Sequence, residues 1–268
     1  MRLKEFSNNL PKPLVNIGNA PLLHHIMDYY SHFGFHDFIL CLGYKADMIK
    51  KYFMEHDNWV PNKSNKKNSS KHDGVFHNKI NDWNITFLDT GIFSNIGQRL
   101  KAVEAHLDDE EMFMANYADV LTDLSLPDFL DYFSRQGKTG IFLGVRPHYS
   151  FHVASIENSG LVNAIQPVTE TNMWINGGYF IFRREIFQYI KNGEELVEEP
   201  FQRLIAAQEL ISLKYDGFWA CMDTFKDKQV LEDLYRTGSP PWQVWKSCQT
   251  RDFKSANFLS AIHDQNKI

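Results

Sequence analysis

Apolar and polar residues alternate along the first half of the chain in blocks typical of helices and buried strands. Apolar residues recur at helical spacing over residues 21–33, and Gly34 follows as a helix C-terminal cap. The continuous apolar run over residues 38–42 is typical of a strand buried on both faces of a parallel sheet. A second helix is expected over residues 46–53. This order of helix, strand and helix with short connections predicts an α/β fold.

The pattern continues, with one break, to about residue 145. Residues 56–80 are rich in Asn, Lys, Ser and His and show no apolar period, which indicates a polar surface insertion. Beyond this insertion, Ser125 is placed to cap a helix. We expect strands at 85–88, 112–115 and 139–145, and helices at 97–106 and 126–136.

The pattern of apolar and polar residues changes after residue 150. Two short runs at 151–156 and 161–166 flank Asn158-Ser159-Gly160, which is a hairpin signal. We expect further strands at 174–182 and 210–215, and helices at 184–191, 200–208 and 224–235. The whole pattern predicts an α/β core with a mostly parallel central sheet, helices on both faces and a more antiparallel second half.

The charge and composition of the chain exclude some classes of binding partner. The formal charge of −5 and a pI near 6.1 argue against a nucleic-acid-binding face. The sequence has no apolar run long enough to cross a bilayer and no signal-peptide pattern, so we expect a cytoplasmic protein without a membrane partner. Cys41, Cys221 and Cys248 are odd in number and widely spaced, which favours free thiols over disulfides or a zinc site.

One lysine stands between two prolines, in Leu10-Pro11-Lys12-Pro13-Leu14. Each proline fixes its own φ and favours extended geometry in the residue before it. The backbone of Lys12 is therefore expected to be rigid, so that its ammonium can meet an anion such as a phosphate at little entropic cost. The sequence is equally compatible with a solvated lysine in a surface turn.

Two aspartates lie where strands are expected to end. Asp119 follows an apolar strand, and Asp223 lies at a strand-to-helix junction, the edge of an open α/β sheet at which ligands bind. Asp123 is the competing candidate for the first position, and Asp223 or Thr224 could simply cap the following helix. Together with Lys12, the two aspartates form a set able to hold one Mg²⁺ on a polyphosphate, because Mg²⁺ prefers carboxylate, water and phosphate oxygens.

The second half offers groups suited to a sugar. The amide of Asn176 could hydrogen-bond a sugar hydroxyl, while Gly177 and Gly178 inside a strand mark either close approach of a ligand or a β-bulge. Glu198 and Glu199 precede a helix, where carboxylates suit the helix dipole, and one of them could accept hydrogen bonds from a sugar.

These motifs resemble those of the sugar-1-phosphate nucleotidylyltransferases, and among them most the glucose-1-phosphate cytidylyltransferases. The resemblance extends from Arg2 to about Trp245. The motifs that carry it are Arg2-Leu3, Pro11-Lys12-Pro13, Ile17-Gly18, His25-Ile26-Met27, Tyr30-Ser31-His32, Gly34-Phe35, Leu42-Gly43-Tyr44-Lys45, Asp89-Thr90-Gly91, Arg99-Leu100-Lys101, Asn176-Gly177-Gly178, Gly217-Phe218-Trp219 and Met222-Asp223-Thr224.

The resemblance implies a Rossmann-like nucleotidyltransferase domain over residues 1–245, followed by a tail over 246–268. It implies an enzyme, usually a homo-oligomer, that joins glucose 1-phosphate to CTP and releases pyrophosphate in nucleotide-sugar biosynthesis for surface polysaccharides or deoxysugars. Mg²⁺ would be held by Asp119 and Asp223, Lys12 would contact the phosphates, and Arg2 would stabilise pyrophosphate. The residues implied to line the substrate site are Tyr117, Asn176, Gly177, Glu198, Glu199 and Trp219.

The sequence departs from the family pattern in three places. Met1 falls where the threonine of the family's glycine-rich loop would stand, so the preceding central strand and the loop are expected to be missing. The family's Glu-Lys-Pro motif is replaced by Gln166-Pro167-Val168, and Val120 replaces the glycine after the first metal aspartate. These departures keep open an alternative from another class, a catalytically silent relative that binds a nucleotide sugar or a partner enzyme.

Overall fold

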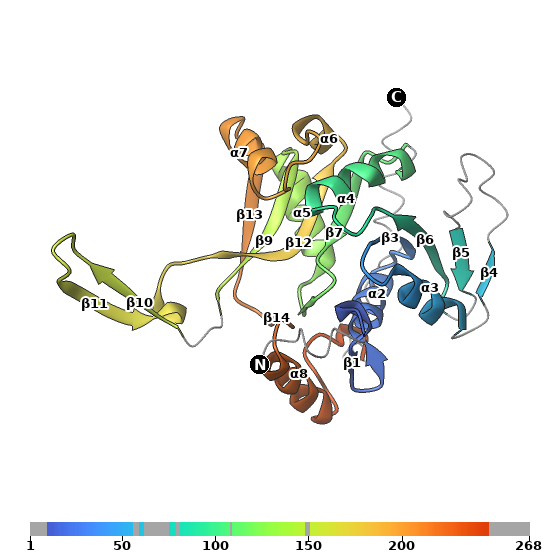
Figure 1. Cartoon of the computed structure of the whole chain (residues 1–268), viewed down its shortest axis with the longest axis horizontal. Helices are drawn as coiled ribbons and strands as arrows, with labels where there is room; N and C mark the ends of the chain where they lie inside the picture. Colours follow the sequence, from blue (N-terminus) through green and yellow to red (C-terminus); the bar gives the residue numbers. More distant parts are fainter. Residues whose placement is uncertain are drawn as a thin grey trace.

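The computed structural model describes residues 10–55, 59–61, 75–78, 81–107, 109–147 and 151–246. Arg2, Cys248 and all of the expected tail except Lys246 lie outside these residues. Within them the chain forms an α/β fold built on two four-stranded sheets (Figure 1). The α helices are α2 Leu22–His32, α3 Ala46–Glu55, α4 Ile96–Val103, α5 Leu126–Gln136, α6 Ile186–Tyr189, α7 Glu199–Ala206 and α8 Phe225–Arg236. Short 3₁₀ turns are η1 Lys12–Leu14, η2 Glu104–His106, η3 Val168–Glu170 and η4 Val244–Lys246.

The larger of the two sheets is mixed. Its strands, in spatial order, are β13 Leu210–Tyr215, β9 Gly140–Val145, β12 Ile175–Arg183 and β7 Met112–Asn116. β13 and β9 are parallel, but β12 runs antiparallel to both of its neighbours, β9 and β7. The expectation of a mostly parallel sheet therefore needs correction, because a strand from the antiparallel second half is inserted between two parallel ones. β7, β9 and β13 still share one direction, so their carboxyl ends meet at one edge.

The second sheet contains β3 Asp37–Leu42, β6 Trp83–Asp89, β5 Val75–Asn78 and β4 Trp59–Pro61, in that order. β3 and β6 are parallel, whereas β5 and β4 add to β6 in antiparallel fashion. β4 and β5 fall inside the polar stretch 56–80. The sequence predicts a polar surface insertion there without naming strands in it, and the described parts of the stretch extend the sheet.

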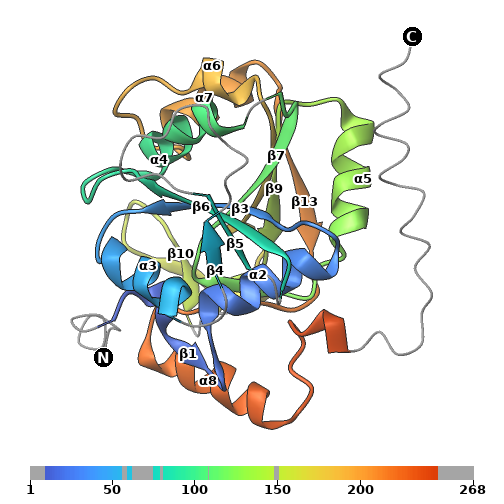
Figure 2. The same ribbon diagram turned by 90° about the vertical axis from the view of Figure 1, so that its right-hand side faces the viewer.

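Helices cover both faces of the larger sheet, as expected (Figure 2). Alternate residues of β12 point to opposite faces. Tyr179 and Ile181 pack with α2 and α5, whereas Phe180 and Phe182 pack with α4, α6 and α7. All four side chains are at most 2% exposed. The second sheet has its own core, in which α2 and α3 cover β3 and β6.

Most of the expected helices and strands are confirmed, with differences at their ends. Ser125 precedes α5 as expected, but its side chain makes no capping hydrogen bond. Lys12 begins the 3₁₀ turn η1 rather than an extended segment, and the turn is closed by the hydrogen bond from Val15 N to Lys12 O (3.0 Å). Buried Leu14 fixes this turn to the core.

Three two-stranded pairs complete the described fold: β1 Asn16–Ile17 with β2 Ala20–Pro21, β8 Val120–Thr122 with β14 Trp219–Cys221, and β10 His152–Ile156 with β11 Val162–Pro167. The β10–β11 pair is the expected hairpin. It projects away from the rest of the molecule (Figure 1). The β8–β14 pair lies beyond the carboxyl ends of β7 and β13 and carries the candidate site.

Candidate active site

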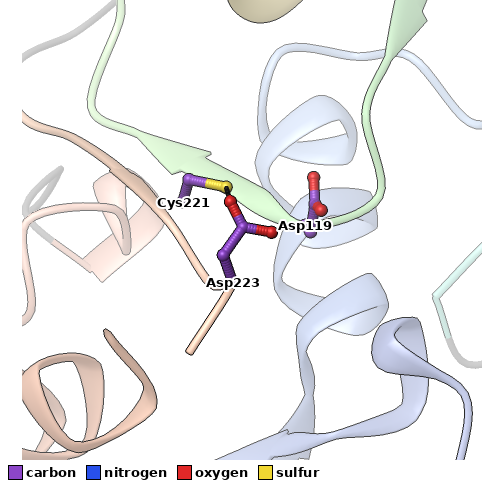
Figure 3. Close-up of side chains that lie close together, drawn as sticks. All are labelled: Asp119, Cys221 and Asp223. Carbon is purple, nitrogen blue, oxygen red and sulfur yellow. Dashed lines mark hydrogen bonds between the residues drawn. The ribbon is translucent and has the colours of Figure 1, made fainter. Parts of the chain in front are cut away.

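The β8–β14 pair brings two distant aspartates together. Cys221 of β14 pairs with Val120 of β8, and the next backbone bond runs from Met222 N to Asp119 O (2.9 Å). Asp119 immediately precedes β8, and Asp223 follows β14 by two residues. Figure 3 shows the carboxyl group of Asp223 directed toward Asp119. Backbone pairing therefore fixes the two carboxylates at the strand ends where the sequence placed them.

Lys12 reaches both carboxylates. Its Nζ lies 3.0 Å from Asp119 Oδ2 and 2.5 Å from Asp223 Oδ1. Burial alone would lower the pKa of Lys12, but the hydrogen bonds and charges of the two aspartates outweigh burial and raise it well above its ordinary value. In return, the hydrogen bond from Lys12 lowers the pKa of Asp223. The shifts of Lys12 and Asp223 both favour the charged forms of these two groups at neutral pH.

The start of α8 is capped by other residues, which leaves the side chain of Asp223 available. Thr224 is the N-cap, and its side chain accepts a hydrogen bond from Asp227 N (3.1 Å). The carboxylate of Asp227 accepts hydrogen bonds from Thr224 N (2.7 Å) and Asp223 N (3.0 Å). The capping alternative for Asp223 is thus met by Thr224 and Asp227, a capping box.

Asp123, the competing candidate, stabilises the turn after β8 instead. Its Oδ1 accepts hydrogen bonds from Phe218 N (2.8 Å) and from the hydroxyl of Tyr215. These bonds tie the segment after β8 to the end of β13 and to the segment between β13 and β14. Asp123 therefore supports the β8–β14 pair, whereas Asp119 faces the second aspartate.

A third potential ligand, Cys221, was not singled out as a site residue by the sequence. Its Sγ donates a hydrogen bond to Asp223 Oδ2 (3.2 Å), and ligand atoms of Asp119, Cys221 and Asp223 lie within 4.8 Å of one another (Figure 3). Burial and the neighbouring carboxylates raise the pKa of this thiol. The signal that could have found it was its position at the end of a strand, two residues before Asp223. Cys41 is the other thiol among the described residues, and both are free, as expected.

The glycines of β12 allow close approach of two aromatic side chains. Gly178 has φ +75°, and a Cβ there would lie 2.7 Å from the Tyr117 ring. Trp219 donates its indole hydrogen to Gly177 O (2.7 Å) and is 8% exposed. The register of β12 against β9 also shifts between Asn176 and Phe180, as a β-bulge at these glycines would require.

Asn176 connects this glycine strand to the aspartates. Its Nδ2 lies 3.3 Å from the hydroxyl of Tyr117, and its Oδ1 accepts from Gly178 N (2.9 Å). Tyr117 is two residues from Asp119. Asn176, Gly177, Tyr117 and Trp219 thus form one contiguous group beside the aspartates.

Two of the expected site residues, Glu198 and Glu199, make no side-chain hydrogen bond or ion pair with this group of described residues. Glu198 precedes α7 and Glu199 begins it. Both are exposed, although the first turn of α7 approaches the group, since Phe201 packs against Phe180 and Phe180 against Tyr117. Their place in the substrate site stays a prediction, as does that of Arg2, which lies outside the described residues.

The donor set fits a hard divalent cation. Asp119 Oδ2 and Asp223 Oδ1 already share one positive charge, the ammonium of Lys12, so the two oxygens are spaced to hold a cation between them. Carboxylate oxygens are the protein ligands that Mg²⁺ prefers, and the half-exposed position of Asp223 leaves room for water and phosphate oxygens.

Comparison with known proteins decides the family. A family model described as "Nucleotidyl transferase" matches residues 1–226. The chain belongs to the nucleotidyl transferase family. It is 35% identical over 247 residues to a glucose-1-phosphate cytidylyltransferase from Salmonella typhi, covering 91% of this chain and 95% of that one. It is 32% identical over 246 residues to a probable glucose-1-phosphate cytidylyltransferase from Bacillus subtilis, with the same two coverages.

Solved structures agree with the fold of this nucleotidyltransferase. A putative glucose-1-phosphate thymidylyltransferase from Bacillus anthracis superposes with a TM-score of 0.60 at 14% identity, covering 94% of this chain and 92% of that one. The Rossmann-like nucleotidyltransferase fold expected from the motifs is therefore confirmed. None of the helices in the described residues is long and apolar enough to cross a membrane.

Proposed function

We propose that this nucleotidyltransferase joins glucose 1-phosphate to CTP and forms CDP-glucose and pyrophosphate. The observation that carries the proposal is the 35% identity to a glucose-1-phosphate cytidylyltransferase over 95% of that enzyme. The arrangement of Lys12, Asp119 and Asp223 at the carboxyl edge of the sheet supports it. We place the reaction in the cytoplasm, because Cys41 and Cys221 are unpaired thiols. Its product would supply the synthesis of surface polysaccharides or deoxysugars.

In the reaction, an oxygen of the sugar 1-phosphate attacks the α-phosphorus of the triphosphate in line. A bond from that oxygen to the α-phosphorus forms, the bond from the α-phosphorus to the oxygen bridging to the β-phosphorus breaks, and pyrophosphate leaves. Catalysis of this kind depends on positioning and on neutralising charge. Mg²⁺, when bound, neutralises phosphate charge and orients the phosphates for the in-line attack.

The residues of this chain have separate tasks in the proposal. Asp119 and Asp223 hold the cation, because their oxygens converge on one point. Lys12 contacts the phosphates from the fixed turn η1, and Arg2 stabilises the pyrophosphate. The substrate-binding residues are Tyr117, Asn176, Gly177, Glu198, Glu199 and Trp219. Trp219 acts through Gly177, because its indole hydrogen is bonded to that residue's carbonyl.

The test is a substrate panel. Purified protein is incubated with Mg²⁺, one nucleoside triphosphate and one sugar 1-phosphate at a time, and pyrophosphate release is measured. The proposal predicts the highest kcat/KM for CTP with glucose 1-phosphate. A higher value for another pair corrects the substrates. Binding of CDP-glucose by calorimetry without pyrophosphate release from any pair would favour the silent relative instead.

We also propose that the protein is a homo-oligomer, and the β10–β11 hairpin supports this. Directly opposed residues of a hairpin share a face, so the pairs Ala154–Ile165 and Ile156–Val162 form one apolar face. Ile156, Val162 and Ile165 are 61%, 55% and 67% exposed. Neither strand contains Lys, Arg, Asp or Glu, the charges that commonly protect exposed strands from association.

A second copy of this chain is the partner that fits, since two uncharged apolar faces of the same shape can pair without electrostatic repulsion. Ile165→Lys should convert the oligomer to a monomer in analytical ultracentrifugation. Gln166→Lys, which places the same charge on the opposite face, should leave the mass unchanged. A wild-type monomer, or an Ile165→Lys oligomer of unchanged mass, would contradict this interface.

A further inference from the structure

The ammonium of Lys12 occupies the position that a divalent cation needs. It binds Asp119 Oδ2 at 3.0 Å and Asp223 Oδ1 at 2.5 Å, and these carboxylates supply the oxygen ligands of the cluster that could hold a metal ion. One carboxylate pair cannot give the same oxygens to a lysine and to a divalent cation at these distances. Lys12 and the cation therefore compete.

The structure also allows the ammonium of Lys12 to move away from the two aspartates. Its backbone is fixed by η1, but the ammonium is carried on a flexible four-carbon chain. The side chains of Lys12, Asp119 and Asp223 are 33%, 25% and 50% exposed, so solvent reaches the contact. A triphosphate brings several anionic oxygens to the same edge of the sheet. It offers the ammonium new partners as strong as those it gives up.

We propose that Lys12 keeps the cation site closed in the free protein and opens it when a nucleoside triphosphate draws the ammonium away. Cation and nucleotide then bind cooperatively. Their coupling through Lys12 adds to the direct attraction between the cation and the triphosphate. By linkage, each ligand strengthens the binding of the other by the same factor. This inference rests on the proposed function only in taking the nucleotide as the ligand that moves Lys12. The competition between Lys12 and the cation stands without it.

The experiment measures Mn²⁺ binding to the purified protein from the electron paramagnetic resonance signal of free Mn²⁺. Lys12→Met keeps most of the side-chain length and removes the charge. Lys228→Met is the matched control, because it removes a lysine from α8 that pairs with Glu232 (2.9 Å) and not with the aspartates. Without nucleotide, Lys12→Met should bind Mn²⁺ about tenfold more tightly than wild type, the size of a typical coupling between two ligands. Lys228→Met should match wild type.

Two further arms make the result decisive. Adding Asp119→Asn to Lys12→Met should abolish the gain, which shows that the extra affinity belongs to this site. CTP, after correction for the Mn²⁺ it binds in solution, should tighten Mn²⁺ binding to wild type by a larger factor than to Lys12→Met. Circular dichroism confirms that each variant is folded.

The proposal is overturned if Lys12→Met binds Mn²⁺ no more tightly than wild type, or if the gain survives Asp119→Asn. Equal CTP effects on wild type and Lys12→Met would overturn the nucleotide's part in opening the site. None of these readouts needs turnover. A protein that releases no pyrophosphate but shows the Mn²⁺ gain would contradict the proposed function and support the competition.

Discussion

Replacing Asp223 with Asn separates catalysis from stability. The substitution keeps the side-chain size and removes one of the two negative charges that face Lys12. The start of α8 should stay intact, because Thr224 and Asp227 provide the cap and Asp223 contributes only its backbone N–H to it. The perturbation is therefore confined to the charge at the proposed cation site.

The expected magnitudes differ sharply for the two properties. Asp223 is 50% exposed, so losing its ion pair with Lys12 should cost about 1 kcal/mol or less. In a domain of this size that lowers the melting temperature by about 2–4 °C at most. Removing one of two charges that hold the cation at the reacting phosphates should reduce kcat by about 100-fold or more.

The stability difference should also depend on pH in a defined direction. Lys12 lowers the pKa of Asp223 in the folded protein. A carboxyl with a lowered folded-state pKa contributes its full stabilisation above its unfolded pKa, which is about 3.9, and loses it as the pH falls through the folded value. Wild type and Asp223→Asn should therefore differ by a constant amount around neutral pH and converge in strong acid.

The assay combines pyrophosphate release in Mg²⁺ with thermal unfolding followed by circular dichroism. Asp216→Asn is the matched control, since Asp216 also pairs with a cationic side chain, Arg146 at 2.9 Å, but lies outside the cluster. It should keep wild-type turnover. An Asp223→Asn variant that retains most of its turnover, or that loses several kcal/mol of stability, would refute the assignment of Asp223 to the cation.

Three other predictions concern the support of the site and its thiol. Gly178→Ala forces φ +75° on a residue with a Cβ and places that atom against the Tyr117 ring, so thermal unfolding should show a loss of about 2–3 kcal/mol. Asp123→Ala removes the acceptor of a backbone and a hydroxyl group, and urea unfolding should show a loss of about 1–3 kcal/mol. Because burial raises the pKa of Cys41 to about 11 and that of Cys221 further, both thiols should react with iodoacetamide more slowly at pH 8 than an unhindered cysteine peptide. Mass spectrometry of the alkylated protein checks this, and rapid labelling of both would contradict the assigned burial.

Local patterns predicted most helices and strands of this fold. The helical spacing over residues 21–33 and the apolar run over 38–42 correspond to α2 and β3. Pairing between distant strands was harder to predict, because nothing local shows that β12 lies between β9 and β7. β4 and β5 were missed because the stretch that contains them is polar and shows no apolar period.

The site was predictable where it depends on strand ends. Asp119 and Asp223 follow strands whose carboxyl ends meet, and Lys12 is presented by a short fixed turn, so these three lie together as the sequence indicated. Cys221 was overlooked because a single cysteine carries no motif. Glu198 and Glu199 lie exposed at the start of α7, and their part in binding the sugar stays a prediction.

The central claim is that Asp119 and Asp223 share one divalent cation and that Lys12 moves from them to the phosphates. The most direct measurement is anomalous diffraction from crystals grown with Mn²⁺ and CTP. The account predicts one Mn²⁺ peak between the carboxylates of Asp119 and Asp223, with the Lys12 ammonium turned to the triphosphate. A Mn²⁺ peak elsewhere, or Lys12 still bound between the two aspartates with CTP present, would contradict it.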